Sequence, residues 1–282
     1  MRWLITGAGG MLATDVAEVV RRSGHDVVEV GRNEVDVTDP GACADAVAGV
    51  DVVLNGAAWT DVDGAEAHEA AAFAVNALGA ANLAVAATRS GARLVHISTD
   101  YVFDGAAAAP YLETEPVRPV SAYGRTKAAG EWAVRAGGTD HLVVRTAWLY
   151  GAHGSSFPRT IGRLLRERGS VDVVTDQVGQ PTWTADLARL VIRLVEAAVP
   201  GGTFHGTSSG LCSWHDLGVE VATHLGLDAS AVRPTTSDAF VRPARRPAYS
   251  VLGHDALLAA GVVPIGDWRE RWRVAAPSVL GR

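Results

Sequence analysis

A glycine-rich turn close to the amino terminus constrains the fold more than any other stretch of this sequence. The short apolar run Arg2 to Thr6 leads into Gly7-Ala8-Gly9-Gly10, and the amphipathic stretch Asp15 to Arg22 follows. The spacing is T-G-x-x-G-x-x-A, with Ala13 where a third glycine is common. Glycines let the backbone approach a phosphate closely, and the free N–H groups at the helix start bind it. The turn therefore predicts a dinucleotide-binding fold.

Four further apolar runs alternate with helical patterns along the first half of the chain. They are Asp26 to Val30, Asp51 to Leu54, Arg93 to Ile97 and His141 to Arg145. Alternating strands and helices predict an α/β fold with a doubly wound parallel sheet, of the Rossmann type. Ligands bind such sheets at the carboxyl ends of the strands. The polar clusters that follow the last three runs are therefore expected to converge on one crevice.

The pattern loosens after Gly151. Four helices and a short strand are expected there: Phe157 to Arg168, Thr184 to Ala198, Ser213 to Leu225, His254 to Ala260, and Val171 to Val174. No sharp linker or repeat separates the two parts. We therefore expect a dinucleotide-binding Rossmann domain at 1–150. Residues 151–282 are expected to form mostly a substrate-binding region that closes the crevice, with some segments returning to the Rossmann domain.

Tyr123 and Lys127 lie four residues apart in S-A-Y-G-R-T-K, at the start of an expected helix. Positions i and i+4 share a helix face, so both side chains can point into one cavity. A nearby ammonium favours the phenolate and lowers the pKa of the tyrosine, which makes proton transfer practical. The alternative is an exposed amphipathic helix on which the two residues merely coexist. The glycine turn and the polar strand ends favour a catalytic pair.

The end of the second expected strand bears on the choice of cofactor. Folds of this kind that prefer NAD carry an acidic residue there, which hydrogen-bonds the adenine ribose. Here the strand ends in Val30-Gly31-Arg32, and a guanidinium pairs well with a 2′-phosphate. Arg32 therefore favours NADPH over NADH; the alternative is an arginine that is simply exposed.

Composition excludes several kinds of partner. The net charge of −6 argues against nucleic acid, because basic residues gather only in the short stretch Arg242 to Arg246. Ala70 to Thr88 is uncharged and long enough to cross a bilayer, but it is mostly alanine and contains asparagine. We therefore expect a buried helix on the sheet and no membrane contact. Cys43 and Cys212 lie far apart and the first residues carry no signal-peptide pattern, which favours the cytoplasm.

Several longer stretches match a known family. They are Ser98-Thr99-Asp100-Tyr101-Val102-Phe103-Asp104-Gly105, Tyr123-Gly124-Arg125-Thr126-Lys127, Arg145-Thr146-Ala147-Trp148-Leu149-Tyr150, Asp176-Gln177-Val178-Gly179-Gln180-Pro181-Thr182, Ser213-Trp214-His215-Asp216 and Arg246-Pro247. With the glycine turn, they make the chain resemble an extended short-chain dehydrogenase/reductase. More narrowly, it resembles the dTDP-4-dehydrorhamnose reductase family, over nearly its whole length.

The resemblance implies roles for individual residues. Tyr123 is the proton donor, Lys127 holds the nicotinamide ribose and lowers the tyrosine pKa, and Thr99 hydrogen-bonds near the substrate carbonyl. Besides Arg32, the residues implied along the cofactor are Gly7, Gly10, Met11 and Leu12 at the diphosphate, Asp36 and Val37 at the adenine, and Ala58, Trp59 and Thr60 at the ribose and phosphates. The residues implied for the sugar pocket are Thr99, Asp100 and Trp148.

The implied activity is NADPH-dependent reduction of the 4-keto group of a dTDP-4-keto-6-deoxyhexose, with Tyr123 as proton donor. The family also uses NADH in places. Some members hold Mg²⁺ at a dimer contact through acidic side chains, so Mg²⁺ and a homodimer are hypotheses, and the sequence places no metal ligand. Which keto sugar is reduced, and on which face, is not determined by these motifs.

Other readings fit less well. Sugar-nucleotide 4,6-dehydratases carry an Asp-Glu pair after the threonine, whereas Asp100 is followed by Tyr101. Epimerases hold NAD tightly and usually have the ribose-binding acid that is missing from the strand end. The resemblance extends to a regulatory subunit of methionine adenosyltransferase, which binds NADP without reductase chemistry. Such a binding module needs no intact Tyr–Lys pair, and this chain has one.

A hydrolase motif and a metal-like spacing also occur. Gly206-Thr207-Ser208-Ser209-Gly210 satisfies G-x-S-x-G, but a nucleophile elbow needs a helix directly after its serine and an aspartate before the histidine. Cys212 and His215 have ligand-like spacing without a second pair. We expect a glycine-rich loop, a helix capping box at Ser213 to Asp216, and no zinc site.

Overall fold

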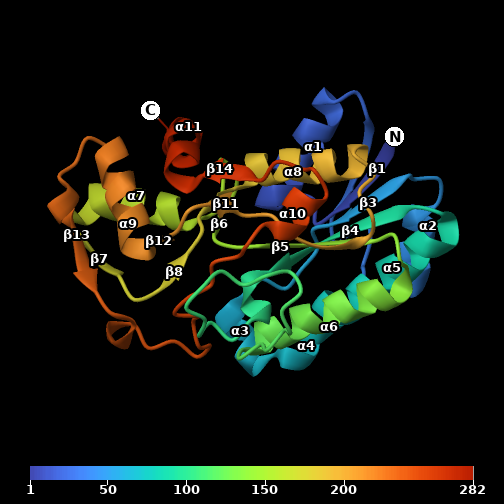
Figure 1. Ribbon diagram of the computed structural model, residues 1–282, viewed down its shortest axis with the longest axis horizontal. Coiled ribbons are helices and arrows are strands. Elements are labelled where there is room, and N and C mark those ends of the chain that lie inside the picture. The colour runs from blue at the N-terminus through green and yellow to red at the C-terminus, as the bar shows by residue number, and fades with distance from the viewer. Residues whose placement is uncertain (282) are drawn as a thin grey trace.

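The computed structural model describes residues 1–281 and contains one large sheet between two layers of helices, with a second region at one end (Figure 1). The sheet has six strands in the order β10-β5-β4-β3-β1-β2, and every pairing is parallel. The strands are β1 (Arg2–Thr6), β2 (Asp26–Val30), β3 (Val52–Asn55), β4 (Arg93–Thr99), β5 (Leu142–Thr146) and β10 (Gly202–His205). The predicted doubly wound α/β fold is confirmed.

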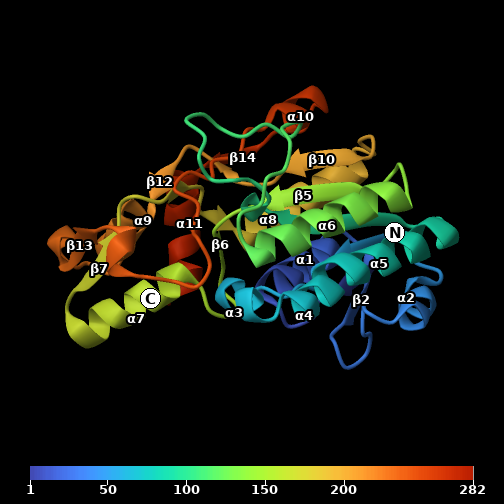
Figure 2. The same ribbon diagram turned by 90° about the horizontal axis from the view of Figure 1, so that it is seen from below.

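Helices cover both faces of the sheet because its strands are apolar on both sides. On one face lie α1 (Met11–Arg22) and α8 (Thr184–Glu196); on the other lie α2 (Pro40–Val47), α5 (Gly79–Ser90) and α6 (Ala122–Gly137) (Figures 1 and 2). In β1, Ile5 packs with the first group of helices and Leu4 with the second, and both are fully buried. Each such side chain stabilises the fold by about 1.5–3 kcal/mol.

The strand order reverses between β1 and β3. From β1 the chain goes to β2 on one side, and then through β3, β4 and β5 on the other. Loops that diverge at such a point leave a crevice at the carboxyl ends of the strands. Thr6 and Asn55 are register partners at this edge, as are Thr99 and Thr146. Segments that follow these strands therefore meet along one edge of the sheet.

The uncharged stretch Ala70 to Thr88 lies within one helical run. The run consists of α4 (Glu69–Phe73), a π-helical turn η1 (Ala74–Leu78) and α5. By length and composition alone, Glu69–Ser90 could cross a membrane. In the structure, however, α5 buries Leu83 and Ala84 in the core between the sheet and α2. The prediction of a buried helix on the sheet is confirmed, and packing on the sheet explains its apolar composition.

The second region is built from short elements around its own core. β7 (Val171–Val174) pairs with β13 (Val232–Thr235), and α7 (Phe157–Arg168), α9 (Trp214–His224) and α11 (Trp268–Leu280) pack beside them.

The other strands are β6 (Leu149–Tyr150), β8 (Val178–Gly179), β9 (Thr182–Trp183), β11 (Ser208–Ser209), β12 (Cys212–Ser213) and β14 (Ile265–Asp267). The remaining helices are α3 (Val62–Ala67), α10 (Asp255–Ala259) and the 3₁₀ turns η2 (Asp100–Val102), η3 (Ala229–Ala231) and η4 (Ser237–Ala239).

Part of the chain after residue 151 belongs to the sheet itself. β10 pairs with β5 at the sheet edge, and α8 packs along α1. The large sheet is therefore completed only when residues 184–205 join it.

Most expected element boundaries lie within two residues of the observed ones, and two differences matter for the site. Helix α1 begins at Met11, four residues before the amphipathic stretch, so the helix starts directly at the glycine turn. Strand β4 continues through Ser98 to Thr99, because its ladder with β5 extends that far. The capping box is confirmed: Ser213 Oγ accepts from the Asp216 amide, and the Asp216 carboxylate accepts from the Ser213 amide.

Candidate active site

The glycine turn after β1 has the geometry of a phosphate-binding turn. Gly7 and Gly9 both have a φ of 79°. A Cβ on Gly7 would lie 2.8 Å from the Gly56 backbone, whereas no atom lies within 4 Å of a Cβ built on Gly9. Gly10 caps α1, and the amides of Met11 and Leu12 come first in the helix, where no intrahelical acceptor exists. This open backbone fits a cofactor diphosphate.

The loop after β2 carries Arg32, Asp36 and Val37. Arg32 is exposed at the strand tip. The strand-end motif contains no acidic residue, but the structure brings Glu34 to that place, where its carboxylate accepts from the Gly31 amide at 2.8 Å. Hydrogen bonds from Thr38 lower the pKa of Asp36. Val37 is buried.

The segment Ala58 to Thr60 follows β3 and is held by Asn76, from the π-helical turn. The Trp59 amide donates to Asn76 Oδ1 at 2.8 Å, and Asn76 Nδ2 donates to the Trp59 carbonyl at 3.2 Å. Asn76 Nδ2 also donates to Thr126 Oγ1 at 3.0 Å. Because Thr126 lies on α6 between Tyr123 and Lys127, Asn76 ties this segment to the helix of the tyrosine–lysine pair.

The structure brings Thr99, Tyr123 and Lys127 together. Thr99 ends β4, Tyr123 lies in the first turn of α6, and Lys127 follows one turn later. Ser121 caps α6, accepting from the Gly124 amide at 3.1 Å. Tyr123 lies beside Thr99, whose Oγ1 donates to Asp100 Oδ1 at 2.9 Å. Tyr123 is therefore half-buried and Lys127 buried in a polar crevice, and the two residues do not lie on an exposed helix face.

The electrostatics of the pair differ from the sequence-based expectation. Lys127 Nζ donates to the Ile97 carbonyl at 2.6 Å and lies 3.4 Å from His96 Nε2. Burial lowers the pKa of Lys127 to about 8. Burial also raises the pKa of Tyr123 to about 12, so the expected lowering of the tyrosine pKa is wrong for this structure. The reason is that the lysine points to a backbone carbonyl while the phenol is desolvated.

Asp100 lies beside this group and is 3% exposed. Burial raises the pKa of Asp100 to about 6, although the neighbouring Ser250 and Thr99 side chains oppose the shift. Its Oδ2 atom is buried without a hydrogen-bond partner among the described residues. The next residue, Tyr101, sets its ring edge-on to Tyr123, with centroids 5.6 Å apart. Asp100 therefore offers an unused acceptor close to Tyr123.

Trp148 lies after β5 in a strained conformation, with a φ of 46°. Its indole is half-buried and stacks face to face on Trp214, with centroids 3.5 Å apart. A Cβ on Gly179 would lie 2.5 Å from the Trp148 ring, so glycine is required there. The strained backbone and the stacking place this indole against the core of the second region.

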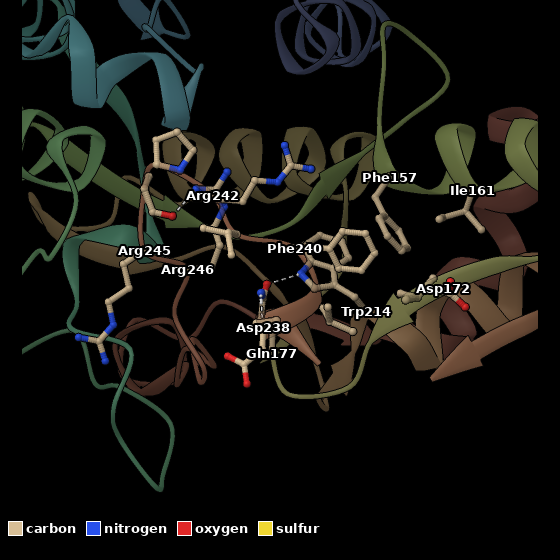
Figure 3. A pocket seen from close by; sticks show the side chains of 16 residues that line it. Phe157, Ile161, Asp172, Gln177, Trp214, Asp238, Phe240, Arg242, Arg245 and Arg246 are labelled. Atoms are coloured by element: carbon tan, nitrogen blue, oxygen red, sulfur yellow. Dashed lines mark hydrogen bonds between the residues drawn. The ribbon is translucent and has the colours of Figure 1, made fainter. Parts of the chain in front are cut away.

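A pocket of about 910 Å³ opens beside Trp214 (Figure 3). Figure 3 shows Phe157, Ile161 and Trp214 on one side and Arg242, Arg245 and Arg246 on the other. Trp214 Nε1 donates to Gln177 Oε1 at 3.2 Å. The pocket thus has an aromatic side with Phe157 and Trp214 and a basic side formed by the segment Arg242 to Arg246, which we call the arginine strap. The sequence motifs assigned no role to the pocket residues, although Trp214, Gln177 and Arg246 lie in the stretches that carry the family resemblance.

Arg246 joins the pocket to the first region. Its Nη1 and Nη2 donate to Asp63 Oδ1 and Oδ2 of α3 at 2.9 and 2.8 Å. The Ala244 amide donates to Asp63 Oδ1 at 3.2 Å. The hydrogen bonds from Arg246 lower the pKa of Asp63. This bidentate pair fixes the arginine strap across the gap between α3 and the second region.

The alternative chemistries find no support in residues 1–281. The serine of the G-x-S-x-G stretch, Ser208, is fully buried in β11, and the next helix starts only at Trp214. Cys212 is buried, and His215 hydrogen-bonds to the Val232 carbonyl. Within this part of the chain, no group of three or more His, Cys, Asp or Glu side chains could hold a metal ion.

Comparisons with known proteins identify the family of this chain. The family described as "RmlD substrate binding domain" matches residues 1–278. A dTDP-4-keto-6-deoxy-D-glucose reductase from Streptomyces niveus is 46% identical over 98% of this chain and 96% of its own. A dTDP-4-dehydrorhamnose reductase from Streptomyces griseus is 46% identical over 100% of this chain and 95% of its own.

A solved structure shows the same likeness in three dimensions. The dTDP-4-dehydrorhamnose reductase of Bacillus anthracis, solved with NADP, superposes with a TM-score of 0.92 at 33% identity, and the match covers 98% of both chains. The family resemblance inferred from the motifs is therefore confirmed. This chain belongs to the dTDP-4-dehydrorhamnose reductase (RmlD) family of extended short-chain dehydrogenases/reductases.

Proposed function

We propose that this protein reduces the 4-keto group of a dTDP-4-keto-6-deoxyhexose with NADPH. The observation that carries the proposal is the convergence of Thr99, Tyr123 and Lys127 at the end of β4, on the same sheet edge as the glycine turn. The names of the two Streptomyces relatives support a nucleotide-linked keto sugar as substrate. The NADP bound to the Bacillus anthracis relative supports the cofactor.

The cofactor site fits a dinucleotide along the turn after β1 and the loops after β2 and β3. Gly7, Gly10, Met11 and Leu12 would bind the diphosphate through backbone amides. Asp36 and Val37 would lie by the adenine, and Ala58, Trp59 and Thr60 along the ribose and phosphates. When bound, NADPH supplies the hydride for the carbonyl carbon. Arg32 is exposed after β2, where it would pair with a 2′-phosphate, so NADPH is the proposed cofactor, with NADH tolerated more weakly.

Tyr123 is the proposed proton donor. With a pKa of about 12, its phenol is protonated at neutral pH and can give its proton to the alkoxide that forms at the carbonyl oxygen. Thr99 lies beside the phenol; its hydroxyl donates to Asp100 Oδ1 in this structure and would have to turn to donate to the same oxygen. Lys127, buried one turn further along α6, would hydrogen-bond the nicotinamide ribose, which is the other role that the family resemblance implies for it.

The second region is the proposed substrate-binding part, and residues 1–150 the cofactor-binding part. Asp100 and Trp148 would contact the sugar: Asp100 has an unpaired acceptor, and an indole packs well on sugar C–H groups. Phe157 and the part of the Trp214 ring that Trp148 does not cover would contact the thymine. Two negative phosphates would be bound by arginines of the strap, since guanidinium binds phosphate oxygens bidentately.

The decisive experiment is product identification. The purified protein is incubated with NADPH and, separately, with dTDP-4-keto-6-deoxy-D-glucose and dTDP-4-keto-L-rhamnose, and the products are identified by NMR. The proposal expects NADPH oxidation together with a new hydroxyl at C4 for at least one sugar. NADPH binding without turnover of either sugar would favour the binding module that resembles the methionine adenosyltransferase regulatory subunit.

The setting of the reaction follows from these ligands. A soluble nucleotide sugar and NADPH are consistent with a cytoplasmic enzyme, and neither nucleic acid nor a membrane is needed. A homodimer remains part of the proposal. Magnesium at a dimer contact stays a hypothesis without assigned ligands; within residues 1–281, no group of three or more His, Cys, Asp or Glu side chains could hold a metal ion.

A further inference from the structure

A buried ion pair lies directly behind Thr99 and Lys127. Glu131 follows Lys127 by one turn of α6, and Arg145 lies on β5. Arg145 Nε donates to Glu131 Oε1 at 2.9 Å, and Arg145 Nη2 donates to Oε2 at 2.8 Å. The two side chains are 0% and 2% exposed. The geometry is bidentate, so it fixes direction as well as distance.

A third hydrogen bond connects this pair to β4. Ser98 Oγ donates to Glu131 Oε1 at 2.6 Å. Ser98 lies directly before Thr99 and is the register partner of Arg145 on β5. Glu131 therefore binds α6 to the ends of both β4 and β5, the two strands that lead to Thr99 and Trp148.

The arginine is fully occupied on its other side. Arg145 Nη1 lies 3.4 Å from both His205 Nε2 and the Glu113 carbonyl, and the guanidinium packs on the Phe103 ring at 4.9 Å. His205 Nδ1 lies 2.9 Å from the Gly253 carbonyl, an arrangement that leaves Nε2 free to accept from Arg145. These contacts give the guanidinium a single orientation.

Such a pair is a costly way to hold a fold together. Removing two charges from water costs several kcal/mol per ion, and apolar residues of similar size often stabilise a core at least as well. Its position suggests another purpose. Lys127 donates to the carbonyl of Ile97, the residue before Ser98, so a slip of β4 along α6 would move Thr99 and the Lys127 acceptor together.

We propose that Ser98, Glu131 and Arg145 are positioning residues, which lock the end of β4 against α6 so that Thr99, Tyr123 and Lys127 keep their spacing. This inference rests on the proposed reductase function. None of the three residues contacts the proposed site for substrate or cofactor. They act through Thr99 and Lys127.

Ser98→Ala is the cleanest test because it leaves the ion pair intact. We expect kcat to fall about tenfold or more, since small displacements of reacting groups are costly, while NADPH affinity and the sugar KM change less than about twofold. Amide hydrogen exchange should become faster in residues 96–103 without a matching drop in Tm. The control is Ser209→Ala, which removes an equally short bond, to the Ile265 carbonyl at 2.6 Å. It should change neither kcat nor exchange in residues 96–103.

The ion pair is tested by rescue. Glu131→Gln should lower kcat and also Tm, because it leaves the Arg145 charge unpaired in the core. The double variant Glu131→Leu with Arg145→Met should recover Tm but not kcat. Recovery of both would mean that the pair only stabilises the fold, and would overturn the inference. If Glu131→Gln does not fold, Ser98→Ala still decides the question.

The outcomes separate this inference from the proposed function. An active wild type with unchanged kcat and unchanged exchange in Ser98→Ala overturns the inference and leaves the reductase assignment intact. A wild type inactive on both keto sugars overturns the assignment. In that case hydrogen exchange, which needs no substrate, still reports whether Ser98 holds the end of β4: faster exchange supports the inference and unchanged exchange refutes it.

Discussion

In residues 1–150 the candidate site residues follow strands of one continuous parallel sheet, whereas in residues 151–281 they lie on short pieces held by side chains. Thr99 ends a seven-residue strand whose ladder with β5 sets its place. Trp214, by contrast, follows the two-residue strand β12 and is placed by stacking on Trp148 and by a hydrogen bond to Gln177.

This difference predicts different consequences of mutation. Positions fixed by backbone ladders tolerate loss of a functional side chain, so changes there should affect chemistry or cofactor binding with little change in fold. Positions fixed by aromatic stacking combine packing and binding in one side chain. Variants in the second region should therefore change sugar recognition and stability together.

The largest effect is expected from Tyr123→Phe. Loss of the proton donor should reduce kcat by about 10²-fold or more, with little change in NADPH affinity or Tm. Tyr150→Phe is the matched control, because the Tyr150 hydroxyl is buried without a partner and lies outside the proposed site. Steady-state kinetics of both variants measure the effect. Near-normal turnover of Tyr123→Phe would remove the tyrosine from its role.

Asp100→Asn is the exception in the first region: because Asp100 is buried, the variant should stabilise the fold while impairing catalysis. The folded-state pKa of Asp100 is raised to about 6, so the unfolded chain ionises first as pH rises from about 4, and stability is lost until about pH 6. The variant removes this cost. We expect a gain on the order of 2–3 kcal/mol at pH 7 and little at pH 4. Chemical denaturation of both proteins at the two pH values measures it; equal gains would contradict the titration of Asp100.

Arg32→Ala tests cofactor choice in the first region. Loss of a charge-assisted contact to the 2′-phosphate should weaken NADPH by about 1.5–3 kcal/mol and leave NADH unchanged. Glu34→Gln should act in the opposite direction, because the Glu34 carboxylate lies at the same strand tip. Binding is measured by fluorescence titration, with the exposed Arg89→Ala as control. Equal losses of affinity for NADPH and NADH would show that Arg32 does not bind the 2′-phosphate.

The smallest effect is expected from Trp148→Phe, which asks whether stacking serves the sugar or only the core. A pocket role predicts a several-fold loss in kcat/KM for the nucleotide sugar, together with a fall in Tm because the stacking on Trp214 is weakened, and NADPH affinity nearly unchanged. The control is Trp3→Phe, since Trp3 is fully buried in the sheet core. That variant should lower Tm by several degrees without a kinetic change. The same pattern in Trp148→Phe would make Trp148 a core residue.

The sequence by itself determined the parts of this protein that depend on local geometry. Glycine spacing after a strand is sufficient for the phosphate turn, and four-residue spacing places Tyr123 and Lys127 on one helix face. Parallel strands carry whatever follows them to one edge, so Thr99 was placed near that pair from the order of elements alone. These rules act over a few residues or on the sheet as a whole.

Only the tertiary structure decided what depends on packing between distant residues. It turned Lys127 toward the Ile97 carbonyl and buried Tyr123, which reversed the expected direction of the tyrosine pKa. It also brought Glu34 to the Gly31 amide and Asp63 to Arg246. Desolvation and side-chain contacts of this kind depend on which surfaces pack against each other in the folded protein. The spacing of residues along the chain does not contain that information.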